Sequence, residues 1–115
     1  MNIKRVPRES LVSRKMSGGI WDGSNIAEVF PADGDTKMSC GIHELFASEA
    51  VIENSPVDDV LYILEGELEL ESDGVVEKFR SGDFAYLRAG TRQIFRVRDR
   101  VKHIYVTYPR NWAQP

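Results

Sequence analysis

Asp59 and Gln93 are polar residues that a strand pattern turns toward the inside of the protein. Asp59 alternates with Leu61, and Gln93 alternates with Phe95, so each shares a face with an apolar neighbour. Neither is a common core residue, and a buried carboxyl group either finds a donor or raises its pKa. We therefore predict that Gln93 binds a ligand and that Asp59 is a general acid or base near neutral pH. The alternative for Asp59 is a structural carboxylate that accepts hydrogen bonds from backbone N–H groups of the strand turn.

Glu44 is the second candidate for acid–base chemistry. It shares its alternation with Ile42 and Phe46, which predicts that its side chain faces the interior. His43 is then expected on the opposite face, at a surface between two subunits. We therefore count Glu44 with Asp59 as a candidate catalytic residue.

The last apolar stretch carries a histidine and a tyrosine in one register. His103 and Tyr105 alternate against Ile104, so one set faces the pocket and the other the outer side of the sheet. The sequence leaves open which set faces inward. We count His103 as a candidate catalytic residue and Tyr105 as a ligand-binding one, against the alternative of a lone histidine satisfied in the core or at the surface. Tyr62 and Tyr86 are further ligand-binding candidates with hydroxyl donors, and aromatic core packing is their alternative.

Short strands and tight turns must position these residues. Apolar and polar residues alternate from residue 26 onward, and no stretch keeps a helical period over the roughly 10–12 residues that indicate a helix. About eight strands with frequent turns are typical of a sandwich or barrel. The run 60–64 is apolar throughout, which predicts a strand covered on both faces. We predict an all-β fold with the strands "NIAEVF", "TKMSCGIHELFA", "DDVLYILEG", "ELELES", "VVEKF", "FAYLRAG", "TRQIFRVR" and "VKHIYVTY".

The length and the charge limit the classes of protein and partner. The 115 residues fit one domain, divided into an N-terminal arm over residues 1–25, anchored by Trp21, and a barrel over 26–115. The net charge of −3 favours neither a nucleic acid nor a membrane surface as partner. The basic N-terminus has no apolar core after it, so a secretory signal is not expected. A single cysteine, Cys40, fits a reducing, cytoplasmic location and is expected to be a buried structural thiol.

Four arginines near the C-terminus pose the alternative of a basic patch for nucleic acid. All four occupy even positions, so they form one solvated strand face that is expected to lie across from three glutamates. The residues are Arg92, Arg96, Arg98 and Arg100, with Glu67, Glu69 and Glu71 as the expected partners.

The segments "LEGELEL" and "GDFAYLRAG" resemble the paired core motifs of the cupin superfamily. Asp59 and Gly66 match the acid and the final glycine of the first motif, and Gly82 and Gly90 match the glycines of the second. The resemblance implies a small, single-domain jelly-roll β-barrel. It also implies a pocket inside the barrel, where cupins hold their ligands.

The histidines of the cupin motifs are missing from this chain. The first two would fall near Glu53 and Ser55, or near Ile52 and Asn54, and the histidine of the second motif falls on Gln93. A cupin metal site needs imidazoles and a carboxylate that converge on one ion. We therefore expect no ordinary metal site and no cofactor.

Four longer segments resemble the ethanolamine-utilisation cupin family of the EutQ type. They are "MSCGIHEL", "DDVLYILEGELEL", "SGDFAYLRAG" and "IYVTYPRNW", and the resemblance covers nearly all of residues 38–112. It matches Glu44 to a Glu or Gln of that family, and it implies acetate-kinase-like phosphoryl transfer. Two observations weaken that implication: the family's second acid is replaced by Leu61, and no phosphate-binding G-x-x-x-x-G-K-[ST] loop is present.

Three functions follow, and they are ranked as given. The first is a metal-independent cupin that binds a small organic metabolite and transfers protons in an isomerase- or lyase-like reaction, through Glu44, Asp59 and His103 or Tyr86. The second is a metalloenzyme with ligands from Glu44, Asp59, Gln93 and His103. The third, ranked close to the first, is a non-catalytic binding or assembly module of a metabolic operon, its cavity filled around Leu61. A homodimer is expected under all three.

Overall fold

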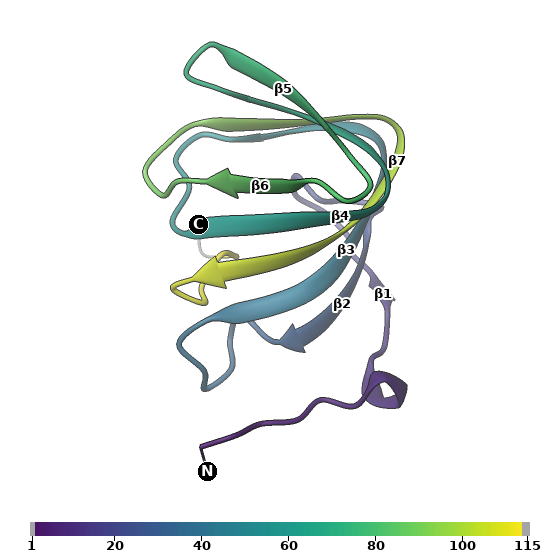
Figure 1. Cartoon of the computed structure of the whole chain (residues 1–115), viewed down its shortest axis with the longest axis vertical. Helices are drawn as coiled ribbons and strands as arrows, with labels where there is room; N and C mark the ends of the chain where they lie inside the picture. Colours follow the sequence, from purple (N-terminus) through teal and green to yellow (C-terminus); the bar gives the residue numbers. More distant parts are fainter. Residues whose placement is uncertain (1, 114–115) are drawn as a thin grey trace.

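Three long, bent strands build most of the molecule (Figure 1). The computed structural model describes residues 2–113. Seven strands form one antiparallel sheet in the order β1-β2-β3-β7-β4-β5, with β6 paired to β4. The elements are η1 (Arg8–Ser10, a 3-10 turn), β1 (Arg14–Lys15), β2 (Asn25–Phe30), β3 (Ser39–Ile52), β4 (Asp58–Ser72), β5 (Val75–Arg80), β6 (Phe84–Leu87) and β7 (Gln93–Tyr108). The predicted all-β fold is confirmed.

Each long strand contributes to two layers because it bends in its middle. β3 and β4 both pair with β7 over most of their lengths, and the register shifts near residue 47 in β3 and near Gly66 in β4. Gly66 has a φ of 83°, and a Cβ at this position would collide with the carbonyl group of Arg100. A glycine is therefore required where β4 turns from one layer to the other. The sequence divided β4 and β7 into two strands each because a bend inside a strand resembles a turn between strands.

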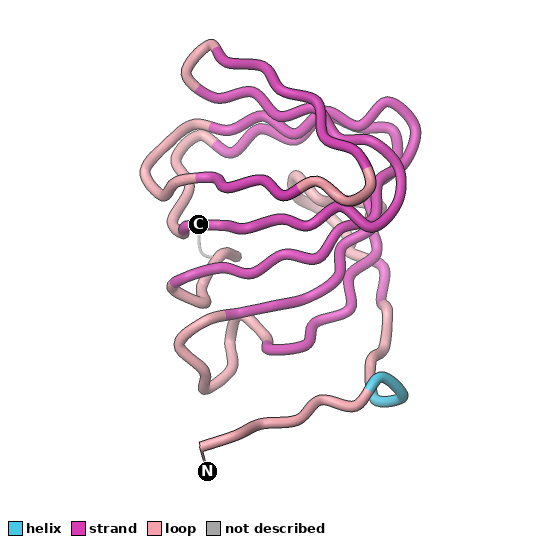
Figure 2. The backbone as a smooth tube through the Cα atoms, in the orientation of Figure 1, coloured by secondary structure: helices cyan, strands magenta, loops and turns pink. Residues whose placement is uncertain are grey.

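The core lies between the two layers. Leu61, Ile63 and Val101 are fully buried, and Leu68 is 1% exposed. The tube in Figure 2 shows strands on both sides of this core and connecting loops gathered at the left edge of the view. Two of these loops are joined by backbone hydrogen bonds, from Ser55 N–H to the Thr91 carbonyl (3.0 Å) and from Gly90 N–H to the Ser55 carbonyl (2.8 Å).

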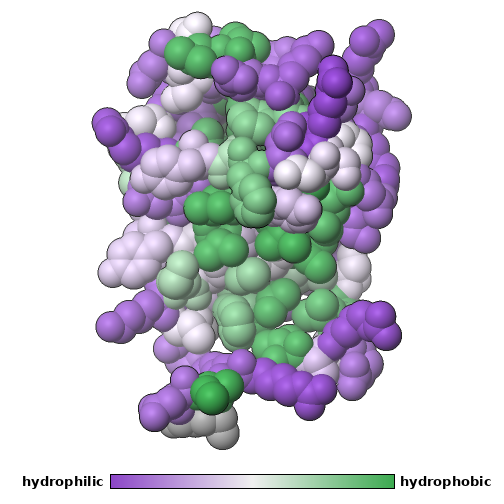
Figure 3. All heavy atoms as spheres, viewed as in Figure 1, coloured by the Kyte–Doolittle hydropathy of each residue, from purple (hydrophilic) through white to green (hydrophobic). Residues whose placement is uncertain are grey.

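The outer face of the layer that contains β4 is apolar and exposed. The expected cover on both faces of the run 60–64 is wrong for the single chain, because Val60 is 40% exposed while Leu61 is fully buried. Phe84, Tyr86 and Tyr108 are also more than half exposed. Figure 3 shows apolar side chains down the middle of the face that it presents.

The N-terminal segment reaches the sheet before the predicted barrel begins. Arg14 and Lys15 in β1 pair with β2, and the following turn brings Trp21 against the core, where its ring centroid lies 5.3 Å from that of Phe95. The division of the chain at residue 25 stays a prediction. In the part of the chain that the structure describes, no helix has the length and hydropathy needed to cross a membrane.

Candidate functional site

Two imidazoles and a phenol lie together on the inner face of the barrel. β3 and β7 pair so that His43 stands directly opposite His103, and the ring centroids of the two imidazoles are 5.7 Å apart. Tyr105, two residues further along β7, lies 6.5 Å from His43. All three residues are at most 5% exposed. The face of β7 that the sequence left open is therefore settled: His103 and Tyr105 point inward.

Two tryptophans extend this cluster in opposite directions. Trp21 packs its edge against His43 at a centroid distance of 5.2 Å, and Trp112 packs against Tyr105 at 5.7 Å. Gly41 lies opposite Tyr105, and a Cβ there would collide with the phenol ring. The strand therefore needs glycine at this position to leave room for the Tyr105 side chain.

Asp59, the second residue of β4, lies on the same inner surface. It stands opposite Thr107 in the register, while Leu61, the next inward residue of β4, stands opposite Tyr105. Asp59 and Tyr105 are thus diagonal neighbours across the strand pair. The Oδ1 atom of Asp59 is buried without a hydrogen-bond partner among the described residues. Burial raises the pKa of Asp59 from 3.8 to about 7.

Further polar atoms of the interior also lack partners within the described chain. They are both ring nitrogens of His103, the Tyr105 hydroxyl, Nε of Arg110 and the indole Nε1 of Trp112. Buried polar atoms are nearly always paired with protein or water, so these unpartnered atoms are places where bound water or a ligand is expected.

The site is uncharged at neutral pH apart from Asp59. Burial and the neighbouring His103 lower the pKa of His43 to about 3, and burial lowers that of His103 to about 4. Burial is also the main cause that raises the pKa of Tyr105. These groups can donate and accept hydrogen bonds without carrying charge, and Asp59 is the acid whose titration falls near physiological pH.

His43 is the residue that the sequence placed on the wrong face. Ser24 Oγ donates to the Trp21 carbonyl (2.6 Å), so the 2.8 Å contact between Ser24 Oγ and His43 Nε2 has the imidazole as donor. The outer face of β3 holds Ile42 and Phe46, and these two apolar residues led to the prediction that this face is buried. The interior position of Gly41 could have indicated the correct phase, because a glycine in a strand marks a close approach.

The predicted inward position of Glu44 is wrong for the same reason. Its carboxylate lies on the outer side, where it accepts hydrogen bonds from Arg100 Nε (2.6 Å) and Asn25 Nδ2 (3.1 Å). These two donors, with Asn25 first, lower the pKa of Glu44. A carboxylate held this way is a poor proton carrier and does not reach Asp59, so the geometry does not favour the catalytic role predicted for it.

The other three candidates fall into two groups. Gln93 is 1% exposed, which confirms its interior position, but its amide donates to the Arg88 carbonyl and to Thr91 Oγ1, both at 3.2 Å. Tyr62 and Tyr86 lie on the outer face, which corrects their predicted place in the cavity. They alternate with inward residues of β4 and β6; Tyr86 is 61% exposed, and the Tyr62 ring packs on Phe84 with 4.6 Å between centroids.

The four residues predicted as ligands of an unusual metal site do not converge on one point. Glu44 lies outside the barrel, and the Gln93 amide is bonded to the turn before β7. Within residues 2–113 no three side chains of His, Cys, Asp or Glu are grouped so that they would hold a metal ion. The residues of this chain therefore do not fit a cupin metal site.

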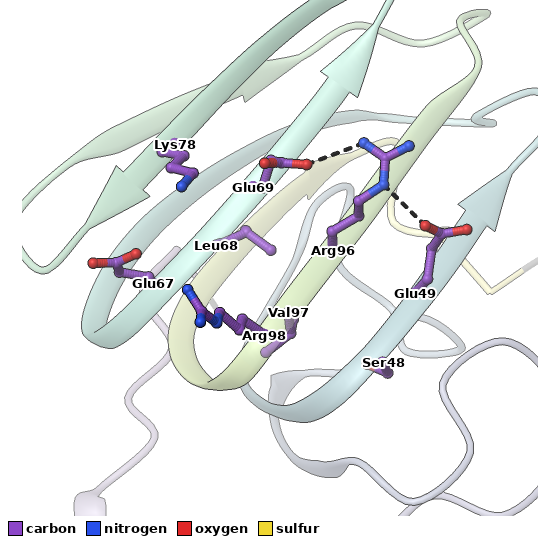
Figure 4. Close-up of a pocket in the computed structure, with 9 residues that line it drawn as sticks. All are labelled: Ser48, Glu49, Glu67, Leu68, Glu69, Lys78, Arg96, Val97 and Arg98. Atoms are coloured by element: carbon purple, nitrogen blue, oxygen red, sulfur yellow. Dashed lines mark hydrogen bonds and ion pairs between the residues drawn. The ribbon is translucent and has the colours of Figure 1, made fainter.

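Two cavities of the described chain lie away from these residues. One, of about 310 Å³, is on the second layer where β4 and β7 separate (Figure 4). There Arg96 forms ion pairs with Glu49 (2.9 Å), Glu69 (3.1 Å) and Glu71 (2.7 Å). Glu69 and Glu71 are two of the partners that the sequence predicted for the arginine face. The other, of about 190 Å³, lies between the Trp21 turn and residues 45–48. Neither is lined by Asp59, His103 or Tyr105.

Comparison with known proteins relates this geometry to one family. The family described as "Ethanolamine utilisation protein EutQ" matches residues 1–114. A curated relative from Clostridioides difficile (strain 630), named acetate kinase EutQ, is 29% identical over 87 residues, which are 75% of this chain and 54% of the relative. This chain thus spans about half the length of that relative.

Solved structures share the fold. The EutQ protein of Clostridium difficile is 26% identical with a TM-score of 0.71, over 79% of this chain and 66% of that one. A putative ethanolamine utilisation protein Q from Salmonella typhimurium LT2 is 19% identical with a TM-score of 0.79, over 95% and 88%. An RmlC-like cupin from Shewanella frigidimarina NCIMB 400 is 17% identical with a TM-score of 0.73, over 90% and 88%. The cupin fold is confirmed.

Proposed function

This chain belongs to the EutQ family, as its sequence resemblance indicated, and from that premise we propose that its barrel interior binds a small organic metabolite, with Asp59 as the proton-exchanging group. The observation that carries the proposal is the buried, unpartnered Oδ1 of Asp59 diagonal to Tyr105. Structural carboxylates in protein interiors are held by donors. The backbone-capping alternative for Asp59 therefore loses support, at least for this oxygen.

The chemistry that these residues supply is metal-independent proton transfer. Asp59, with a pKa of about 7, exchanges a proton readily at neutral pH. His103 is neutral and offers one acceptor and one donor, and Tyr105 offers a hydroxyl. An isomerase- or lyase-like step, in which a proton leaves one atom of the ligand and another returns, needs no more than these groups.

A screen of small acids, amines, alcohols and sugars for thermal stabilisation tests the proposal. Wild-type protein should be stabilised by at least one compound that also shifts the ring resonances of His103 and Trp112 in NMR spectra. Asp59→Asn should lose this response. Glu44→Gln, which changes a carboxylate on the outer face, should keep it. Unchanged binding of every hit by Asp59→Asn would remove Asp59 from the site.

Acetate-kinase-like phosphoryl transfer is the second candidate, favoured by the 29% identity to the C. difficile relative. It ranks second because Leu61, fully buried in the core, stands where the sequence comparison placed the family's second acid. Formation of acetyl phosphate from acetate and ATP, trapped as the hydroxamate, is the direct assay. Formation of acetyl phosphate by the wild-type protein would reverse the ranking.

We further propose a homodimer through the outer face that carries Val60, Phe84 and Tyr86. A contiguous exposed apolar face of this kind is typical of an interaction surface. Light scattering after gel filtration should give the mass of a dimer for the wild type and the mass of a monomer for Tyr86→Lys. The mass of a monomer for the wild type would contradict the proposal. The single free cysteine, Cys40, supports a cytoplasmic location.

A further inference from the structure

The phenol ring of Tyr105 is covered by the C-terminal part of the chain. Tyr105 is 5% exposed, and the ring of Trp112 lies on it at a centroid distance of 5.7 Å. Trp112 is itself half-buried, so it lies between Tyr105 and the solvent. Its Nε1 atom is near enough to the Tyr105 hydroxyl to lower the pKa of that group, against the larger rise that burial causes, but it forms no hydrogen bond with it. Neither ring lines the two cavities described above, so the indole occupies the space beside Tyr105 that a ligand would need.

The C-terminal strap, residues 109–113, carries this indole. β7 ends at the left edge of Figure 1, on the side where the connecting loops gather. Pro109 has no N–H group to continue the β-ladder, and both Tyr108 and Pro109 are exposed. Beyond them the Trp112 backbone N–H donates to the Arg110 carbonyl at 2.8 Å, which gives the strap a turn of its own. The strap is thus a short unit that follows β7 through an exposed connection.

Few polar contacts hold the strap on the barrel. Arg110 Nη1 donates to the Thr36 carbonyl at 3.3 Å, and Thr107 Oγ1 donates to the Pro109 carbonyl at 3.2 Å. Arg110 Nε and Trp112 Nε1 are buried and have no partner among the described residues. A buried donor without a partner opposes the closed position, because water would bind it once the strap moves away. The apolar contact of the indole and these unpaired donors therefore act in opposite directions.

We propose that the C-terminal strap is a lid that opens without unfolding of the barrel, and that a ligand reaches Tyr105 only after Trp112 has left its place. This inference deepens the proposed function, because the lid closes the site proposed there. Local openings of this kind leave the rest of a protein folded. A minor state of this type is populated at about 0.1–10%. The apparent affinity for a ligand that binds only the open state is reduced by the same fraction.

Hydrogen exchange of the Trp112 Nε1 proton measures the opening in the wild type. NMR follows this proton at several low urea concentrations, and Trp21→Phe assigns the signals of the two indoles. Exchange through a moving strap should be slowed about 10- to 1000-fold and should not change with urea, since little surface is exposed. Exchange that accelerates with urea as steeply as global unfolding would overturn the lid. Exchange as fast as that of free indole would overturn it too, since Trp112 would then not cover Tyr105.

Free indole is the probe for access to the interior. Trp112→Ala should bind added indole in the space that the side chain leaves, with a saturable shift of the Tyr105 ring resonances in NMR spectra. The wild type should bind indole more weakly by the reciprocal of the open fraction from hydrogen exchange, about 100-fold for an open fraction of about 1%. Phe84→Ala, which removes an exposed aromatic ring from the outer face, should behave as the wild type does.

Equal indole binding by the wild type and Trp112→Ala would contradict the lid. Absence of indole binding by Trp112→Ala would also contradict it, because the space would then close without the side chain. If Trp112→Ala does not fold, hydrogen exchange in the wild type decides alone. The two proposals fail separately: a metabolite screen without a hit contradicts the proposed function, whereas the lid is decided by hydrogen exchange and indole binding.

Discussion

Asp59→Asn should change how the stability of this protein depends on pH. Burial raises the pKa of Asp59 in the folded protein from 3.8 to about 7. Between these values the folded protein keeps the Asp59 proton and the unfolded chain loses it, so the free energy of unfolding falls as the pH rises. The favourable contribution is complete below 3.8, where both states are protonated, and it is lost once the pH exceeds about 7.

The size of the effect follows from the width of this window. One pKa unit corresponds to about 1.4 kcal/mol, and about two units of the window lie between about pH 5 and about pH 7. The wild type should therefore lose at most roughly 3 kcal/mol through Asp59 across that range, and the asparagine variant none. His43 and His103 titrate in both proteins, so their contribution cancels in the difference between them.

Urea unfolding of both proteins from about pH 5 to about pH 8 measures this difference. The stability of Asp59→Asn relative to the wild type should increase by roughly 3 kcal/mol with rising pH. Glu44→Gln is the control: the pKa of Glu44 is lowered by Asn25 and Arg100, so its effect on stability changes only below about pH 5. A relative stability of Asp59→Asn that stays constant within about 0.5 kcal/mol would refute a buried Asp59 with a raised pKa.

Three further predictions concern the same interior. Gly41→Ala should destabilise the protein by about 2 kcal/mol or more in urea unfolding, because the added methyl group collides with the Tyr105 ring; an unchanged midpoint would show that β3 yields at no cost. His103→Leu should raise the free energy of unfolding at neutral pH by about 1 kcal/mol, since it removes two unpartnered buried nitrogens, and should abolish ligand binding; a less stable variant would show that these nitrogens are paired in solution. Elemental analysis of the purified protein should find no stoichiometric metal, since Glu44 and Gln93 do not face Asp59; one metal per chain would require a different ligand set.

Much of the fold could be predicted because apolar and polar residues alternate regularly along most of its strands. Asp59, Leu61 and Ile63 in β4, and Gln93 and Phe95 in β7, all lie on the predicted inner face. The spacing of the two motifs depends on glycines such as Gly66, whose backbone and close contact admit no other residue without strain. Local constraints of this kind are visible in one sequence.

The inner face of β3 was predicted wrongly because both faces of this strand are partly apolar and the signal of Gly41 was not used. Ile42 and Phe46 cover the outer side, and that face competes with the true core face in any pattern of alternation. For this reason Glu44 was predicted to lie in the site, where the structure places His43. Tyr62 and Tyr86 were misplaced for a related reason: aromatic residues on an exposed apolar face look like cavity residues until the strand pairing is known.

The most direct measurement is the titration of the Asp59 carboxyl carbon by ¹³C NMR in the folded, ligand-free protein. The environment of its Oδ1 atom, buried and without a partner in the described chain, predicts a midpoint at about 7. A midpoint near the ordinary value of 3.8 would show a carboxylate that is solvated or paired. In that case the proton-exchanging site proposed in the barrel would lose its basis.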